Sequence, residues 1–161
     1  RVLELPYKGE RLSLLVLLPD EVDGLAALES RLTEDSLRAW TSAVRDRRVR
    51  VGLPRFTATS QFTLSQTVTA LGMPSAFDEM EADFSGMTGK RDLFISLIVH
   101  KAFVEVNEEG TEAAAATGVA MKLTVIATAE KFIADRPFLF LIRDRASGCI
   151  LFLGRVADPT L

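Results

Sequence analysis

The stretch Asn107-Glu-Glu-Gly-Thr-Glu-Ala-Ala-Ala-Ala-Thr-Gly118 decides how the chain is interpreted, because a long apolar segment runs directly into it. That segment, residues 94–106, is predicted to be a buried β-strand. A buried strand normally ends in turn residues, whereas the side chains that follow here are small. With a period of two, Thr111, Ala113, Ala115 and Thr117 share one face, and none of them is larger than threonine. This face could enter a packed sheet.

Local propensity alone also allows a different structure for the same residues. Alanine is the best helix former, and Thr111 is a suitable N-cap for a short alanine-rich helix. Propensity is a weak guide, so the neighbouring motifs must decide between helix and extended strand.

Three motifs occur in order along the second half of the chain. The segment that begins at His100-Lys-Ala and continues through Asn107 to Thr117 resembles the hinge of the reactive-centre loop in serpins, a family of protease inhibitors. Phe132-Ile-Ala-Asp-Arg-Pro-Phe-Leu-Phe-Leu-Ile142 resembles the signature of that family, and Phe152-Leu-Gly-Arg-Val-Ala-Asp-Pro159 resembles its C-terminal strand. Their order and spacing identify the chain as a member of the serpin family by resemblance.

The resemblance implies an α+β protein with the serpin fold, of which residues 1–161 form the C-terminal half of a single domain. The implied structure is mostly antiparallel sheet with short helices, and the reactive-centre loop spans about residues 108–131. The N-terminal half, with the strand beside which the loop inserts, is expected to be absent, so that half is an expected partner.

The resemblance also implies the mechanism of a trap. A serine protease cleaves the loop and forms an acyl-enzyme, and the freed hinge then inserts into a β-sheet, as serpins do. The implied hinge residues are Glu108, Glu109, Gly110, Thr111, Glu112, Ala113, Ala114, Ala115, Ala116 and Thr117. The family's usual loop length places the reactive bond at Thr124–Val125. Lys122–Leu123 is the alternative, because an exposed lysine suits trypsin-like proteases.

The implied target is a serine protease with a small or medium apolar pocket, and Leu123 would also suit a papain-like cysteine protease. An extracellular location is expected from the resemblance. Two other interpretations stay open: a non-inhibitory serpin-fold binding protein or chaperone, and a fragment that acts only as half of a reassembled structure.

The residues give no indication of an enzyme. His100 is the only histidine, and it shares the predicted face of Ala102 and Val104, so a core position is expected. By resemblance it belongs to the region that controls opening of the sheet. Cys149 is the only cysteine and is expected to be a small buried hydrophobe. No metal site and no cofactor are predicted.

The net charge of −3 gives no electrostatic support for a nucleic acid or membrane partner. One basic cluster is present, and a solvated surface is the simpler interpretation of it than a heparin or phosphate site. It consists of Arg45, Arg47, Arg48 and Arg50.

Periodicity and capping predict the remaining elements. Hairpins are expected over residues 2–19 and 137–156, a strand over 48–53, and short helices after Gly24, after Thr33 and over 64–71. Residues 74–91 are expected to be irregular, with one helical turn near Phe84. The apolar segments Leu14–Leu18 and Phe138–Ile142 are expected to be partly uncovered in the chain alone.

Overall fold

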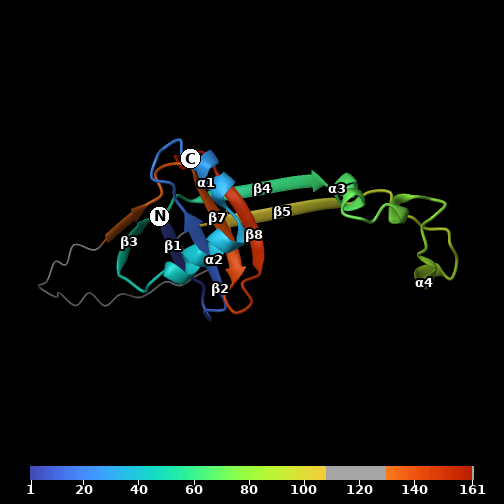
Figure 1. Ribbon diagram of the computed structural model, residues 1–161, viewed down its shortest axis with the longest axis horizontal. Coiled ribbons are helices and arrows are strands. Elements are labelled where there is room, and N and C mark those ends of the chain that lie inside the picture. The colour runs from blue at the N-terminus through green and yellow to red at the C-terminus, as the bar shows by residue number, and fades with distance from the viewer. Residues whose placement is uncertain (108–129, 161) are drawn as a thin grey trace, which may run out of the picture. The chain divides into compact units, whose positions relative to one another are not determined.

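The computed structural model describes residues 1–107 and 130–160. The chain divides into two compact units, unit 1 with Arg1–Phe56 and Glu105–Leu161, and unit 2 with Thr57–Val104. In chain order the elements (Figure 1) are β1 (Val2–Pro6), β2 (Leu12–Leu17), α1 (Leu25–Arg31), α2 (Glu34–Ala43), β3 (Val49–Gly52), β4 (Phe56–Thr63), α3 (Ser65–Ala70), the 3₁₀ turn η1 (Ser75–Phe77), α4 (Ser85–Thr88), β5 (Val99–Val106), β6 (Glu130–Ile133), β7 (Phe138–Asp144) and β8 (Ile150–Val156).

Unit 1 is built on an antiparallel sheet with strand order β1-β2-β7-β8 (Figure 1). Both predicted hairpins are confirmed, β1 with β2 and β7 with β8. The first turn uses Gly9 at φ 86°, a conformation that glycine adopts without a steric penalty. The two hairpins join through β2 and β7, which therefore lie in the middle of the sheet.

Helices α1 and α2 cover one face of this sheet. Leu15, Leu17, Leu139 and Leu141 form a buried cluster there, and the apolar sides of the two helices pack against it through Leu25, Leu28, Leu32, Leu37 and Trp40. The predicted cap of α2 is confirmed: Thr33 Oγ1 accepts from the Ser36 amide, and Ser36 Oγ accepts from the Thr33 amide.

The opposite face of the sheet is buried as well. The ring of Phe56 lies 6.1 Å from that of Phe138 and 5.0 Å from that of Phe140. The expectation that Leu14–Leu18 and Phe138–Ile142 are partly uncovered is therefore wrong, because all ten residues are buried. The central position of β2 and β7 gives each strand a neighbour on both sides, and packing on both faces completes their burial.

A continuous run of uncovered apolar side chains in unit 1 lies instead on β8, the strand at the sheet edge. Ile150, Leu151, Phe152 and Leu153 are all exposed in the described chain. Cys149, which directly precedes β8, is exposed too, so its expected burial is wrong. Strand pattern alone indicated an apolar environment there, but only one neighbouring strand is present within the described residues.

A separate parallel pair, β3 with β6, completes the strands of unit 1. The predicted strand over residues 48–53 is confirmed by β3, whereas β6 was not predicted. Phe132 of β6 is buried, and the guanidinium of Arg1 lies 5.2 Å from the centre of its ring.

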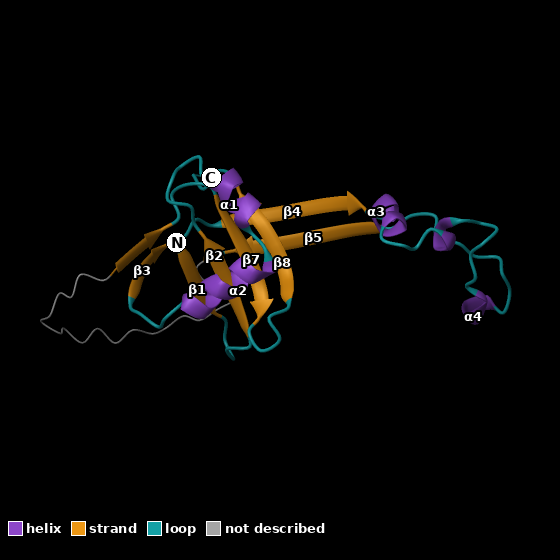
Figure 2. Cartoon of the chain, in the orientation of Figure 1, coloured by secondary structure: helices purple, strands orange, loops and turns teal. Residues whose placement is uncertain are grey.

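Unit 2 contains most of the β4–β5 pair, and short helical turns and loops connect these two strands along the chain (Figure 2). The helix predicted over 64–71 is confirmed by α3, and Phe84 precedes the short helix α4, as expected. The 3₁₀ turn η1 in the same segment was not predicted. Strand β4 was not predicted.

The expectation of a long buried strand over residues 94–106 is wrong in two respects. The strand itself, β5, begins only at Val99, and of its residues only Val104 and Val106 are buried. Phe94, Leu97 and Phe103 are exposed. Within the described residues β4 is the only strand paired with β5, so one edge of β5 lacks a neighbour.

Candidate functional site

The candidate site consists of the two strands that flank the predicted reactive loop. Strand β5 ends at Val106, and β6 begins at Glu130, so residues 130 and 131 of the expected loop belong to a strand. The hinge residues 108–117, the bond Thr124–Val125 and the alternative bond Lys122–Leu123 all lie outside the described residues.

Strand β5 is held at its start by two hydrogen bonds to the segment that follows β4. The Leu64 amide donates to the Ile98 carbonyl at 2.9 Å, and the Ile98 amide donates to Ser65 Oγ at 3.0 Å. These contacts fix the end of β5 that lies farthest along the chain from the hinge.

The two faces of β5 differ sharply in burial toward its C-terminal end. Ala102 is half-buried and Val104 and Val106 are buried, whereas Phe103 on the other face is 57% exposed. The strand that leads into the hinge thus offers one packed face and, within the described residues, one unpaired edge.

His100 lies on β5 on the same side as Ala102 and Val104, but it is exposed. The expected core position is therefore wrong for this chain. On the face that His100 shares, Ala102 is half-buried and Val104 is buried, so burial begins only after the histidine. No described strand lies along the second edge of β5 to enclose the imidazole. Its expected role in sheet opening depends on partners that the described residues do not supply.

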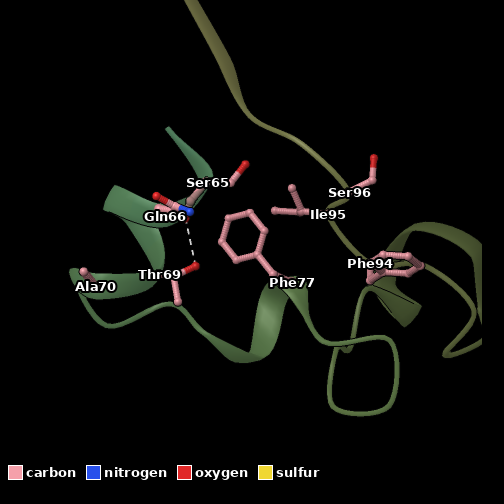
Figure 3. A pocket seen from close by; sticks show the side chains of 8 residues that line it. All are labelled: Ser65, Gln66, Thr69, Ala70, Phe77, Phe94, Ile95 and Ser96. Carbon is pink, nitrogen blue, oxygen red and sulfur yellow. Dashed lines mark hydrogen bonds between the residues drawn. The ribbon is translucent and has the colours of Figure 1, made fainter. Parts of the chain in front are cut away.

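An open hollow of about 440 Å³ lies beside the start of β5 in unit 2 (Figure 3). Its apolar side is formed by Phe77, Phe94 and Ile95, and the Ile95 amide donates to the carbonyl of Ala76 at 2.9 Å. Thr69 Oγ1 donates to the Ser65 carbonyl at 2.8 Å, so this hydroxyl is engaged in the structure of α3. The lining contains no ionisable side chain, and the hollow therefore has no group for acid–base catalysis.

On the other side of the loop, β6 is anchored to β3 and to the chain start. The Ala134 amide donates to the Gly52 carbonyl at 2.8 Å, and the Arg1 guanidinium donates to the Lys131 carbonyl. Arg47 Nη1 lies 3.1 Å from a carboxylate oxygen of Glu130, an exposed ion pair. The loop is therefore followed directly by a strand that is fixed by backbone and side-chain contacts.

Neither a metal-ligand cluster nor a membrane-spanning helix is present in the described part of the chain. Residues 1–107 and 130–160 contain no group of histidine, cysteine and carboxylate side chains that could hold a metal ion. Nor does any helix within those ranges have the length and apolar character needed to cross a bilayer.

The strand pairs, the terminal hairpin and the three motifs define the class of protein, and comparison with known families agrees. The family model for serpins, described as serine protease inhibitors, matches residues 1–159, and the chain belongs to the serpin family. It is a C-terminal portion of a serpin, in accord with the three motifs.

Among individual relatives, the chain is 50% identical to a leukocyte elastase inhibitor of Homo sapiens and 49% identical to serpin B3 of Homo sapiens, with 99% of this chain aligned in each case. The alignments cover 44% and 41% of those proteins, so the chain spans less than half the length of these curated relatives.

Two solved structures confirm the serpin fold and its mixture of helices and antiparallel sheets. Uncleaved ovalbumin matches with a TM-score of 0.82 and 39% identity, over 98% of this chain and 42% of that one. Native protease nexin-1 with heparin matches with a TM-score of 0.76 and 37% identity, over 98% and 41% respectively.

Proposed function

We propose that the full-length protein inhibits serine proteases as a suicide substrate, through insertion of its cleaved loop into a sheet beside β5. The observation that carries this proposal is the state of β5. It leads directly toward the hinge, one of its faces is packed, and within the described residues one of its edges is unpaired. The family description and the name of the relative, leukocyte elastase inhibitor, support the same activity.

The covalent step follows the ordinary chemistry of serine proteases. The protease serine attacks the carbonyl carbon of Thr124, the bond to the Val125 nitrogen breaks, and the amine of Val125 leaves with a proton. The product is an ester between the protease and Thr124. Water would hydrolyse this ester unless the protease site is distorted first, so insertion must be faster than deacylation.

Backbone pairing supplies the driving force for insertion. Roughly a dozen new backbone hydrogen bonds, at ~0.5–1.5 kcal/mol each, sum to the order of 10 kcal/mol. If the hinge pairs with the edge of β5 that is unpaired within the described residues, its small side chains would lie next to the packed face of that strand. Side chains of this size can be buried there without forcing the core to expand; they are Thr111, Ala113, Ala115 and Thr117.

The proposed partners are an elastase-like serine protease and the N-terminal half of the same serpin domain. Inhibition of a papain-like cysteine protease is a further proposal, based on Leu123, and the 161-residue chain alone is proposed to be inactive. An extracellular location stays a prediction from the family resemblance, which the names of the relatives do not support. Fractionation of cells that make the full-length protein would measure it.

The decisive experiment incubates the full-length protein with elastase-like, trypsin-like and papain-like proteases. We expect a covalent complex that survives SDS with the elastase-like enzyme. Complete cleavage of the loop without any covalent complex would refute the trap mechanism and favour a non-inhibitory serpin.

A further inference from the structure

The parallel pairing of β3 with β6 places two cations side by side. Arg50 is the register partner of Lys131, and both side chains are exposed. Residues at paired positions project from the same face of a sheet, and neighbouring strands lie ~4.8 Å apart. Like charges at directly opposed positions destabilise a strand pair, so this arrangement is unfavourable in the chain by itself.

The neighbouring residues do not neutralise this pair. Arg47 is occupied by Glu130 at 3.1 Å, and Arg45 donates to the carbonyls of Ser42 and Val44 near the end of α2. Arg50 and Lys131 form no ion pair within the described residues, and neither does their exposed neighbour Arg48. We call these three residues the ladder cations.

The ladder cations form a positive surface on a chain that is negative as a whole. Residues 45–50 and 130–131 contain five cations against two carboxylates, whereas the complete chain has a net charge of −3. Arginine is well suited to carboxylate partners because its guanidinium can bind both carboxylate oxygens at once.

We propose that the ladder cations bind acidic residues beside the active site of the target protease. This inference rests on the proposed function, since it requires a protease that engages the loop. Lys131 follows Val125 by six residues, which limits their separation to ~22 Å at ~3.6 Å per extended residue. A protease is at least about 30 Å across, so its surface near the cleft comes within reach of the β3–β6 pair.

A protein surface fits these residues better than a long polyanion does. Two carboxylates, Asp46 and Glu130, lie within the same short segments. A polyanion that tracks along the surface would meet both negative charges. A protease can instead present a few carboxylates that match the ladder cations, while Glu130 stays paired with Arg47.

The test uses the full-length protein and an elastase-like serine protease that has acidic residues around its cleft. The protease carries serine-to-alanine at its nucleophile, so that it binds the loop without cleaving it. Arg50→Gln/Lys131→Gln is compared with the control Lys8→Gln/Arg31→Gln, which removes the same charge from exposed positions at the β1–β2 turn and the end of α1.

We expect the ladder variant to associate about 10-fold more slowly than the unmodified protein at ~0.05 M salt, with the control within about twofold. The difference should largely disappear at ~0.5 M salt, where exposed charges are screened. Arg50→Lys should retain most of the rate because it keeps the charge.

Equal association rates for the ladder variant and the control would overturn the proposal. Unchanged protease association together with lost retention on a sulfated polysaccharide column would overturn it in favour of a polyanion. Thermal melting of both variants verifies folding, and the single variant Lys131→Gln replaces the double one if the latter is unfolded. A separate assay with the active protease tests the trap: if the trap fails, no SDS-stable complex forms. The association rate with the inert protease still measures binding to the ladder cations in that case.

Discussion

Gly154 lies directly against the ring of Phe140, its partner in the β7–β8 pair. A Cβ atom at position 154 would stand 2.6 Å from Cζ of that ring and 2.7 Å from Cε1. Phe140 is buried and is also in contact with Phe56, so the ring has little room to retreat. The absence of a side chain at position 154 is therefore a packing requirement of the sheet.

The first prediction concerns this contact. Gly154→Ala should destabilise the full-length protein by about 1–3 kcal/mol, because an extra methyl group overfills a packed core. Urea unfolding measures the effect. Gly86→Ala is the matched control, since a Cβ atom there meets nothing within 4 Å. Equal midpoints for the two variants would contradict the packing argument.

The second prediction concerns Asp144 at the start of the β7–β8 turn. Its carboxylate accepts from the amides of Ser147 and Ala146 and from Arg11 Nε, each at 2.9 Å. The hydrogen bond from the Ser147 amide, followed by that from Arg11, lowers the pKa of Asp144 from 3.8 to about 2. Because the folded pKa is depressed, the stabilisation is complete above the unfolded pKa and is lost as the pH falls through the folded one.

Asp144→Asn should therefore lower the urea midpoint of the full-length protein near neutral pH. The difference from the unmodified protein should shrink between pH 3.8 and about 2, the window set by the two pKa values. Glu79→Gln, at an exposed position, serves as the control. A difference that stays constant down to pH 2 would rule out the charge of Asp144 as its cause.

The third prediction tests the face of the hinge. Thr111→Arg in the full-length protein would place a charge on the face that must enter the sheet, at a cost of several kcal/mol. Insertion should slow, so hydrolysis should exceed trapping, and the ratio of covalent complex to cleaved product should fall. Glu112→Arg, on the opposite face, should change this ratio much less. Equal ratios in the two variants would show that the assigned face is wrong.

The fourth prediction is the reactive bond itself. Cleavage of the full-length protein by an elastase-like protease should give a C-terminal peptide that begins at Val125, as determined by mass. If the hinge inserts, the melting temperature of the cleaved protein should rise well above that of the intact form. A peptide that begins at Leu123 would assign the bond to Lys122 and the target to trypsin-like proteases.

The fifth prediction concerns the 161-residue chain alone, which should not inhibit and should associate with itself. Its exposed strand β8 carries the side chains of Leu151 and Leu153, which are 49% and 56% exposed, and exposed apolar edges promote pairing. Light scattering should detect oligomers, and Leu151→Lys/Leu153→Lys should reduce them. Stoichiometric inhibition by a monomeric form of this chain would refute the prediction.

Local sequence signals predicted the local structure well. The cap of α2 depended on Thr33 and its near neighbour Ser36, and the hairpin turns depended on Gly9 and on residues 145–148. Each of these features involves residues a few positions apart, so their pattern can be recognised without knowledge of the fold. The family motifs added the fold class, an α+β serpin domain of mostly antiparallel sheet with short helices.

Burial was predicted poorly wherever it depends on distant strands. His100 and Cys149 lie in apolar sequence, yet both are exposed, because each lies in or next to a strand with a single described neighbour. Strand β6 was missed because its pairing with β3 joins residues about eighty positions apart. For β4, the alternation of Phe56 and Ala58 with the threonines beside them is a pattern typical of a strand.

The central place of β7 has a consequence for any protease that cuts the loop. Strand β7 lies between β2 and β8, with Phe138 and Leu141 fully buried, and β6 is paired with β3. A cut before Glu130 would divide the polypeptide into two pieces. The shorter, C-terminal piece would stay paired with the longer one in two sheets, through β7 with β2 and through β6 with β3. The nicked molecule should therefore travel as one particle in gel filtration, and its two pieces should separate only in denaturant.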